Sequence, residues 1–272
     1  MTDALFEIRA VRYAYDSLPA LNGLDLTIRR GSRVALLGAN GSGKSTFLRL
    51  LDALDFAQEG TIRFDGETLT PERLDDDAFA HSFRSRVGLV FQNPDVQLFN
   101  ATVLDELAFA PLQLRLEKQE IRQRIDHVMN ELDIAPLAGR PPHRLSMGEK
   151  KRVAIASVLV IDPEVLLLDE PTASLDPRSQ SEIINLLAGW SGDARTAVTA
   201  THDLGIVEDI ADHCVVFESG RVVAEGPPRE IVQNEELLYR TGLLHAHRHR
   251  HESGVVHSHP HLHRHGDHEH GE

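Results

Sequence analysis

The sequence predicts an α/β protein with a parallel sheet and a phosphate-binding loop. An apolar run at 34–37 leads into a glycine-rich segment, 38–46, and a helical apolar pattern follows at 47–51. A second run, 165–168, is wholly apolar, which is typical of a parallel strand that is buried on both faces. It ends in an acidic pair, 169–170. Strand, glycine loop and helix in this order are the context that a phosphate-binding loop needs.

The glycine-rich segment has the spacing G-x-x-x-x-G-K-S and consists of Gly38, Ala39, Asn40, Gly41, Ser42, Gly43, Lys44, Ser45 and Thr46. Glycines let successive backbone N–H groups point at one anion, and the helix N-terminus adds positive charge. We expect Lys44 to reach the β- and γ-phosphates and Ser45 to bind Mg²⁺, with Thr46 assisting. The alternative, a glycine-rich turn with an incidental lysine, is disfavoured by the full match in this context. The loop therefore predicts binding of a nucleoside triphosphate.

Composition narrows the class of protein. A chain of 272 residues that is 41% hydrophobic and 26% charged is typical of a soluble globular protein with one large domain and appendages. The single cysteine, Cys214, excludes an intramolecular disulfide framework and fits a reducing cytosol. The N-terminus lacks the pattern of a signal peptide, and the apolar run at 153–161 is too short to span a bilayer. The formal charge of −14 argues against a general nucleic-acid binder.

Three further regions have recognisable patterns. Residues 5–30 alternate apolar and polar positions, which predicts strands of a small antiparallel sheet. Residues from about 100 to 161 are mostly helical in pattern, with an apolar stripe that indicates packing at Ile121, Ile125, Val128, Met129 and Leu132. Residues 214–217 and 221–224 predict a hairpin, and 230–244 predict a closing helix.

Polar residues follow several predicted strands at the edge where α/β sheets bind ligands. Asp169 and Glu170 are costly to desolvate without partners, and Mg²⁺ with its waters would be such a partner. His202 follows the strand at 196–201, and Gln92 follows another apolar strand. A lone histidine at a strand end is usually structural, but its position after a phosphate loop and an acidic pair favours a functional role.

Two helix starts carry capping signals. Ser146 and Glu149 have the S-x-x-E spacing of a capping box, so the segment can be explained as a helix cap alone. Alternatively, Ser146 and Gly148 offer a hydroxyl and an N–H group to a phosphate. Asp176 and Pro177 predict another helix start, with aspartate at the N-cap.

These motifs together resemble the ATP-binding subunit of ABC transporters over about residues 4–230. They stand in that family's order: Walker A at 38–46, the Q-loop glutamine Gln92, the signature at 145–149, Walker B at 165–170, the D-loop at 174–176 and the switch histidine His202. The resemblance implies an ATPase with a RecA-like P-loop core, an antiparallel β-subdomain and an α-helical signature subdomain at about 93–160. The whole ATPase domain is expected at 1–244.

The resemblance also implies roles for individual residues. Glu170 is expected to activate the attacking water, while His202 and Lys44 contact the phosphates. The Mg²⁺ ligands implied are Ser45, Gln92 and Asp169, and the adenine-stacking aromatic is Tyr15, although a half-buried strand tyrosine is the alternative. In a head-to-tail dimer the residues that would act on the other subunit's nucleotide are Ser146, Gly148 and Asp176. The signature departs from the family pattern because Met147 replaces a glycine and Glu149 replaces a glutamine.

A finer resemblance is to energy-coupling-factor ATPases, especially those of cobalt and nickel import, through segments 90–99, 108–112 and 148–156. It implies integral membrane transport subunits docked near Gln92, a homodimer or a pair with a paralogous ATPase, no nucleic acid, and a peripheral location on the cytoplasmic face of the cell membrane. Import of another micronutrient such as a vitamin, or of zinc, is the alternative. A soluble ABC ATPase of translation or DNA repair is disfavoured because such proteins resemble tandem cassettes or carry long coiled-coil insertions, whereas this sequence has one cassette and no basic patch. A metal-storage protein leaves the six ATPase motifs unexplained.

Residues 245–272 differ in composition from the rest of the chain. Eleven of the 16 histidines lie there: His245, His247, His249, His251, His257, His259, His261, His263, His265, His268 and His270. The scarcity of apolar residues predicts a disordered segment without ligand. Neutral imidazoles suit Ni²⁺ and Co²⁺, so the tail is expected to bind such ions, with a solvated low-complexity tail as the alternative.

Overall fold

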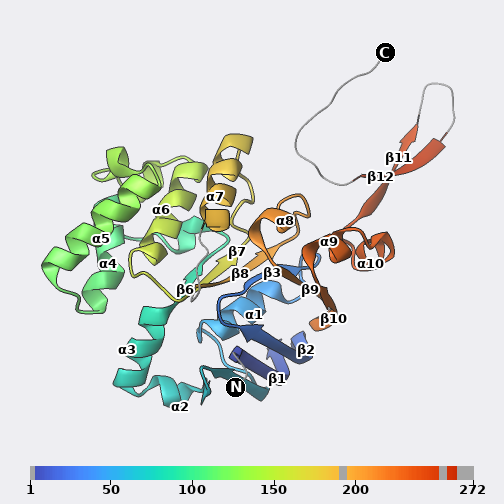
Figure 1. The fold of residues 1–272 in the computed structure, drawn as a ribbon, viewed down its shortest axis with the longest axis horizontal. Helices are drawn as coiled ribbons and strands as arrows, with labels where there is room; N and C mark the ends of the chain where they lie inside the picture. The colour runs from blue at the N-terminus through green and yellow to red at the C-terminus, as the bar shows by residue number, and fades with distance from the viewer. Residues whose placement is uncertain (1–3, 190–194, 251–255, 262–272) are drawn as a thin grey trace.

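A parallel sheet forms the centre of the computed structural model, which describes residues 4–189, 195–250 and 256–261 (Figure 1). The strand order is β10-β9-β3-β8-β7-β6, and all neighbours except the edge strand β10 pair in parallel. The strands are β3 (Arg33–Leu37), β6 (Val87–Val90), β7 (Val165–Asp169), β8 (Thr196–Thr201), β9 (His213–Glu218) and β10 (Arg221–Gly226). The predicted parallel sheet and the predicted hairpin, β9–β10, are both confirmed.

An antiparallel sheet packs beside this centre, as the alternation at 5–30 predicted. Its order is β2-β1-β4-β5, with β1 (Ala4–Tyr15), β2 (Leu18–Arg29), β4 (Glu59–Phe64) and β5 (Glu67–Thr68). The turn between β4 and β5 has positive φ at Asp65 (51°) and Gly66 (84°), which suits the two-residue Asp-Gly hairpin turn.

Alternate residues of β3 face two different hydrophobic cores. Val34 and Leu36 belong to the core shared with the antiparallel sheet and α1 (Lys44–Leu51). Ala35 and Leu37 belong to the core shared with the helical subdomain and α7 (Pro177–Gly189). The short helix α8 (Val207–Ile210) covers the same side. The central sheet is therefore buried on both faces, which explains its uninterrupted apolar strands.

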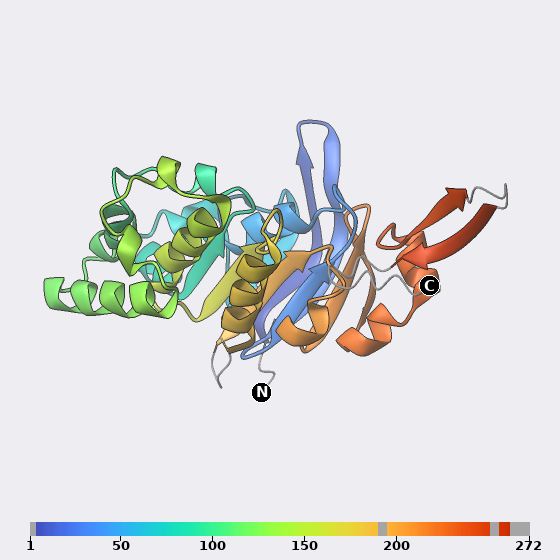
Figure 2. The same cartoon turned by 90° about the horizontal axis from the view of Figure 1, so that it is seen from above.

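The helical subdomain lies at one end of the molecule in both views (Figures 1 and 2). It contains α4 (Val103–Gln113), α5 (Lys118–Glu131), α6 (Met147–Leu159) and the 3-10 turns η1 (Pro94–Val96), η2 (Ala135–Leu137) and η3 (Pro142–Arg144). The apolar stripe of α5 is buried, as predicted. Helices α2 (Pro71–Leu74) and α3 (Asp77–Arg86) connect the antiparallel sheet to β6.

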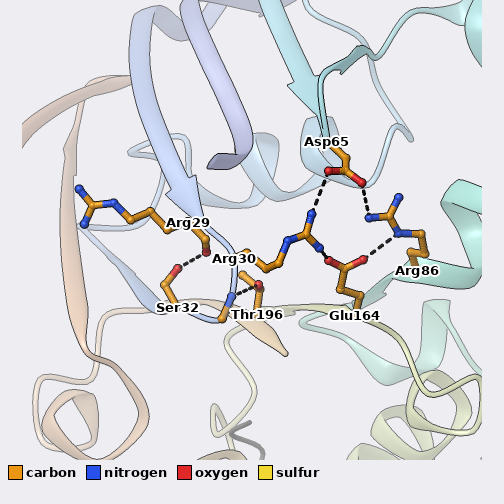
Figure 3. Close-up of polar contacts among 8 residues, drawn as sticks. Arg29, Arg30, Ser32, Asp65, Arg86, Glu164 and Thr196 are labelled. Atoms are coloured by element: carbon orange, nitrogen blue, oxygen red, sulfur yellow. Dashed lines mark hydrogen bonds and ion pairs between the residues drawn. The ribbon is translucent and has the colours of Figure 1, made fainter. Parts of the chain in front are cut away.

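A network of charges ties the subdomains together where the central strands begin (Figure 3). Arg86 lies 2.7 Å from both Glu164 and Asp65, and Arg30 lies 2.9 Å from Asp65 and also pairs with Glu164. Gly31 N–H donates to Thr196 Oγ1 at 2.9 Å. These contacts join β2, the β4–β5 turn, α3 and the start of β7, and leave the opposite edge of the sheet free for the loops that bear the predicted site.

The C-terminal part differs from the sequence prediction in two places. The predicted closing helix at 230–244 is two short helices, α9 (Pro228–Val232) and α10 (Glu235–Arg240). The side chain of Asn234 accepts a hydrogen bond from Leu237 N–H at 3.1 Å and starts a new helix, and Gly242 (φ 71°) follows its end. Beyond it, β11 (His245–Arg250) and β12 (Val256–His261) pair as an antiparallel hairpin, where the sequence predicted disorder.

The hairpin projects from the body of the molecule in both views (Figures 1 and 2). Among the predicted tail ligands, His251, His263, His265, His268 and His270 lie outside the described residues.

Across the parts of the chain that the structure describes, the helices lack the combined length and apolarity of a membrane span.

Candidate functional site

The loop between β3 and α1 has the backbone that a phosphate cradle requires. Gly43 has φ 108°, and a Cβ there would lie 2.7 Å from the carbonyl oxygen of Ala20. At Gly38 a Cβ would lie 2.5 Å from the carbonyl oxygen of Phe217. Glycine is therefore required at both positions by close backbone packing as well as by conformation. The side-chain oxygen of Ser42 is buried without a hydrogen-bond partner among the described residues, as a group that serves a phosphate would be.

Lys44 lies inside this loop. Its Nζ donates to the carbonyl oxygen of Gly38 at 2.6 Å and to that of Ala39 at 3.3 Å. Burial lowers the pKa of Lys44, while the negative charges of Glu170 and Asp169 partly oppose that effect. The lysine thus stands between the loop and the acidic pair, where a phosphate chain could replace the loop carbonyls as its partner.

The predicted Mg²⁺ ligands meet beside the lysine. Asp169, at the end of β7, has a hydrogen bond from the Ser45 hydroxyl at the start of α1. Burial raises the pKa of Asp169, and its Oδ1 is buried with no hydrogen-bond partner in the described part of the chain. A buried carboxylate oxygen without a partner, next to a serine hydroxyl, fits a hard cation that takes oxygen ligands.

Glu170, the residue directly after Asp169, pairs with His202. The Glu170 side chain is almost fully buried, and its Oε1 lies 2.8 Å from Nδ1 of His202. The backbone of Glu170 has φ 46°, which is rare for a residue with a side chain, and its N–H donates to the carbonyl oxygen of Ala200 at 2.9 Å. Such local strain is retained where the surroundings hold it in place, often at functional sites.

A cavity of about 790 Å³ brings together five of the sequence-predicted site residues, namely Ala39, Asn40, Gln92, Glu170 and His202. Its lining comes from the phosphate loop, the Q-loop and the ends of β7 and β8: Ala39, Asn40, Gln92, Glu170, Thr172, Ala173, Ser174, Gln180, His202, Asp203, Gly242 and Leu243. Gly242 and Leu243 were not predicted from the sequence. They reach the loop because the chain after α10 returns to it, and a Cβ at Gly242 would lie 3.6 Å from Ala39.

Tyr15 lies at the end of β1 beside the phosphate loop. Its hydroxyl is 3.4 Å from Thr46 Oγ1, and its ring meets that of Tyr13 edge to face at 5.0 Å. The ring is 44% exposed. An exposed aromatic face next to the loop suits stacking on a base better than packing in the core.

The signature segment starts α6 with the predicted capping box. Ser146 Oγ accepts from Glu149 N–H at 3.3 Å, and Glu149 Oε2 accepts from Ser146 N–H at 2.7 Å. A hydroxyl has one donor and two acceptor sites, so Ser146 can cap the helix and still donate to a phosphate. The two explanations of this motif are therefore compatible. The replacement of glutamine by Glu149 is explained by the cap.

The other signature replacement is also accommodated. Met147 is the first residue of α6 and is 41% exposed, so this position does not need glycine. Gly148 is different, because a Cβ there would lie 2.7 Å from Ser179 Oγ. Ser179 in turn donates to Asp176 Oδ2 at 2.7 Å, and Asp176 caps α7 as predicted. Among the described residues, neither Ser146 nor Gly148 lines the cavity, and their action on a second subunit's nucleotide stays a prediction.

Lys151 was missed by the sequence reading. It belongs to a basic run, but it is 1% exposed, and its Nζ donates to the carbonyl oxygens of Phe91, Gln92 and Glu170. Burial lowers its pKa to about 8. Spacing in the sequence does not single it out, because Lys150 lies one helical turn before Val153 and Ala154, which are as buried as the residues one turn after Lys151.

This arrangement can perform phosphoryl transfer to water, which needs positioning and charge neutralisation more than covalent catalysis. Mg²⁺, when bound, would supply charge neutralisation and orient the phosphates. Lys44 and the loop N–H groups are placed to bind the phosphate chain. Glu170 is placed to orient and deprotonate a water, and His202 holds its carboxylate while facing the same cavity.

The chain matches the sequence profile of the ABC transporter family over residues 21–173. It is 56% identical over 247 residues to the nickel import ATP-binding protein NikO of Rhodobacter capsulatus, covering 90% of this chain and 97% of that protein. It is 42% identical to the energy-coupling factor transporter ATP-binding protein EcfA of Carboxydothermus hydrogenoformans, covering 87% of this chain and 86% of that protein.

Among solved structures, cbiO1 of Clostridium perfringens, described as part of the ABC transporter complex cbiONQ, matches with a TM-score of 0.74 and 38% identity. The match covers 89% of this chain and 95% of that chain. These relatives and this solved structure are each matched over more than four fifths of the chain. The chain therefore belongs to the ABC transporter ATP-binding family, in its energy-coupling-factor branch, and it is an ATPase that uses ATP and Mg²⁺.

Proposed function

We propose that this ATPase powers import of a divalent transition-metal ion, nickel or cobalt, through an integral membrane partner. The observation that carries the proposal is the 56% identity to a nickel import ATP-binding protein over 97% of that protein's length. The energy-coupling-factor relative supports the same type of transporter without naming a substrate. Import of zinc or of another micronutrient such as a vitamin is the second candidate.

Uptake measurements test the proposal. In cells that carry this gene, deletion is expected to abolish high-affinity accumulation of Ni²⁺ or Co²⁺, and the wild-type gene should restore it. Lys44→Ala should fail to restore uptake because it removes the charge that binds the phosphates. Unchanged Ni²⁺ and Co²⁺ uptake, together with a loss of zinc or vitamin uptake, would contradict the metal assignment and favour the second candidate.

The membrane partner needs a docking surface, and we infer that a groove between α3 and α4 provides it. The groove has a volume of about 800 Å³ and includes His81, Val87 and Phe109 in its lining. Close to it, Phe99 is 66% exposed and meets Phe109 edge to face at 5.0 Å. Exposed aromatic rings beside a groove are typical of sites that receive an amphipathic helix.

The groove starts at the strand that leads into the Q-loop, so a helix seated there would move with Gln92. Phe99→Glu is expected to abolish co-purification with the membrane subunits while ATP binding persists. Leu18→Glu is the matched control, since Leu18, the first residue of β2, is 73% exposed and does not belong to the lining of this groove. Equal co-purification of both variants would exclude this face. Docking there would place the chain on the cytoplasmic face of the cell membrane.

The site also supports dimerisation. Ser146, Gly148 and Asp176 lie outside the cavity lining, and a head-to-tail second subunit would bring the same residues onto the nucleotide. The second subunit is either another copy or a paralogous ATPase. Size measurement with the Glu170→Gln variant in MgATP distinguishes these, because a homodimer forms from this chain alone.

For the C-terminal hairpin we propose binding of Ni²⁺ or Co²⁺. The register of β11 and β12 pairs His245 with His261, His247 with His259 and His249 with His257. Directly opposite residues of an antiparallel pair share one face of the hairpin. The six histidines therefore hold alternate, paired register positions of the two strands, and neutral imidazole is a ligand type that suits Ni²⁺ and Co²⁺.

Calorimetric titration of Ni²⁺ and Co²⁺ into the full chain tests the hairpin. Replacing the six paired histidines by asparagine should remove most of the binding. Replacing His265, His268 and His270 instead is the matched control and should leave most of it. The same stoichiometry in the wild type and the six-residue variant would refute the hairpin site.

A further inference from the structure

Lys151 is a buried cation that joins three segments of the chain. Its ammonium donates to the carbonyl oxygen of Gln92 at 2.8 Å, to that of Phe91 at 3.3 Å and to that of Glu170 at 3.4 Å. An ammonium has three N–H groups and no acceptor, so three carbonyl oxygens use all its donors. A buried cation is costly unless it is compensated in this way, and the nearby carboxylates of Asp169 and Glu170 add attraction.

The three carbonyls belong to the two segments that carry the catalytic side chains. Gln92 follows β6, and Glu170 follows β7. Both contacts are made to the backbone, so the lysine fixes where each residue sits and leaves its side chain free to face the cavity. The helix that bears Lys151, α6, also starts at Ser146. One helix thus connects the group proposed to contact the second subunit's nucleotide with both catalytic segments.

We propose that Lys151 is a positioning residue for ATP hydrolysis, which holds the Gln92 and Glu170 segments in alignment with helix α6. This inference rests on the roles proposed for Gln92 and Glu170. The lysine contacts the backbone of both segments, so it affects the chemical step through Gln92 and Glu170. Lys44 already supplies the charge that binds the phosphates, so loss of Lys151 leaves nucleotide binding largely intact.

The neighbouring lysine is a natural control. Lys150 lies 2.6 Å from Asp95 and also ties α6 to the segment after β6. It has no hydrogen bond to Gln92 or Glu170 among the described residues. If the lysines only attach the segment after β6 to α6, substituting either lysine should lower activity. If Lys151 positions the catalytic segments, only its substitution should do so.

The test compares Lys151→Met, Lys151→Gln, Lys151→Arg and Lys150→Met in the full chain assembled with its partners. We expect Lys151→Met to lower kcat by about 10- to 100-fold, the size of effect that a small misplacement of catalytic groups produces. The Kd for ATP should change by less than about threefold, because a residue that acts only on the chemical step lowers kcat without weakening ground-state binding. Lys151→Arg keeps the charge and several donors and should recover a substantial part of kcat. Lys150→Met should stay within about twofold of wild type, because its ion-pair partner Asp95 is 55% exposed and the pair does not reach the catalytic segments.

A kcat for Lys151→Met within about twofold of wild type would overturn the proposal, as would a parallel fall of ATP affinity and kcat. If Lys151→Met does not fold, the ratio of kcat between Lys151→Arg and Lys151→Gln decides in its place, and equal values overturn it. Glu170→Gln is measured beside them. Wild-type turnover in that variant would show that the catalytic assignment itself has failed, whatever the Lys151 variants do.

Discussion

His202 Nδ1 lies 2.8 Å from Glu170 Oε1, so the ends of β8 and β7 are joined by their side chains at the nucleotide site. Glu170 is buried, whereas the His202 side chain is 55% exposed toward the cavity. The histidine can therefore hold the carboxylate with one ring nitrogen and present its other face to a phosphate. We propose that this contact links the sensing of the γ-phosphate by His202 to the activation of water by Glu170.

His202→Ala is expected to lower kcat by about 10- to 100-fold because Glu170 loses the group that orients it. His202→Asn, whose amide can take the place of Nδ1, should recover part of the rate. His213→Ala is the matched control, since His213 pairs only at 3.4 Å with Glu225 on the surface. Steady-state kinetics would contradict this assignment if His202→Ala and His213→Ala gave the same kcat.

If each nucleotide site combines Lys44 of one subunit with Ser146 of the other, two inactive variants should complement each other. Mixing Lys44→Ala subunits with Ser146→Arg subunits gives heterodimers in which one site has both lesions and the other has neither. Some ATPase activity should return on mixing, although each variant alone is inactive. If the mixture stays as inactive as its components, then either Ser146 does not act in trans or both sites must fire together. Nucleotide binding to each variant, measured separately, tells whether the subunits are intact.

Asp52 predicts a pH-dependent gain in stability. It ends α1 and is buried, and burial raises its pKa to about 7, although Arg84 and Arg49 oppose this. A carboxyl whose pKa is raised on folding contributes stability that is fully present below about pH 4 and is lost as pH rises through about 7. Asp52→Asn removes this loss and should raise the free energy of unfolding by about 1–3 kcal/mol at pH 8.

At pH 5 the same substitution should raise the free energy of unfolding by less than half as much, because pH 5 lies above the ordinary pKa of the carboxyl but well below its pKa in the folded protein. Thermal unfolding at both pH values measures the difference between the variant and the wild type. Asp55→Asn is the control, because Asp55 pairs with Arg49 at 2.6 Å and should gain nothing when neutralised. A gain for Asp52→Asn that is equal at pH 5 and pH 8 would be inconsistent with a raised pKa.

The charge network at the other edge of the sheet predicts a loss of stability without a loss of nucleotide binding. Glu164→Ala removes the partner of both Arg30 and Arg86 and should lower the free energy of unfolding by about 1–3 kcal/mol. The Kd for ATP should not change, because Glu164 lies where β7 begins and the site lies where it ends. Glu67→Ala, which breaks an exposed pair with Arg73, should cost less than about 1 kcal/mol. Similar losses in the two variants would rule out a cooperative network.

Much of the site could be predicted because the groups that bind phosphate and metal follow strands at one edge of a parallel sheet. Lys44, Asp169, Glu170 and His202 are separated widely in the chain, but their strands are adjacent in the sheet. The edge rule for α/β folds therefore brings them together without any knowledge of side-chain contacts.

The remainder depended on contacts that local patterns do not contain. Lys151 reads as one member of a basic run, and only the packing of α6 against the Q-loop shows that it is buried. The residues predicted as a closing helix form two short helices because the Asn234 side chain caps a new start. Gly242 lines the cavity because the chain after α10 returns to Ala39, and no periodic pattern in the sequence encodes that return.

The most direct test is ATP turnover by Glu170→Gln, with dimer formation followed by light scattering in MgATP. The variant should bind ATP as well as the wild type, should hydrolyse it about 10²- to 10⁴-fold more slowly, and should accumulate as a closed dimer. Lys44→Ala, which cannot hold the phosphates, should neither bind nor dimerise. Wild-type turnover in Glu170→Gln would contradict the assignment of Glu170 as the base that activates water.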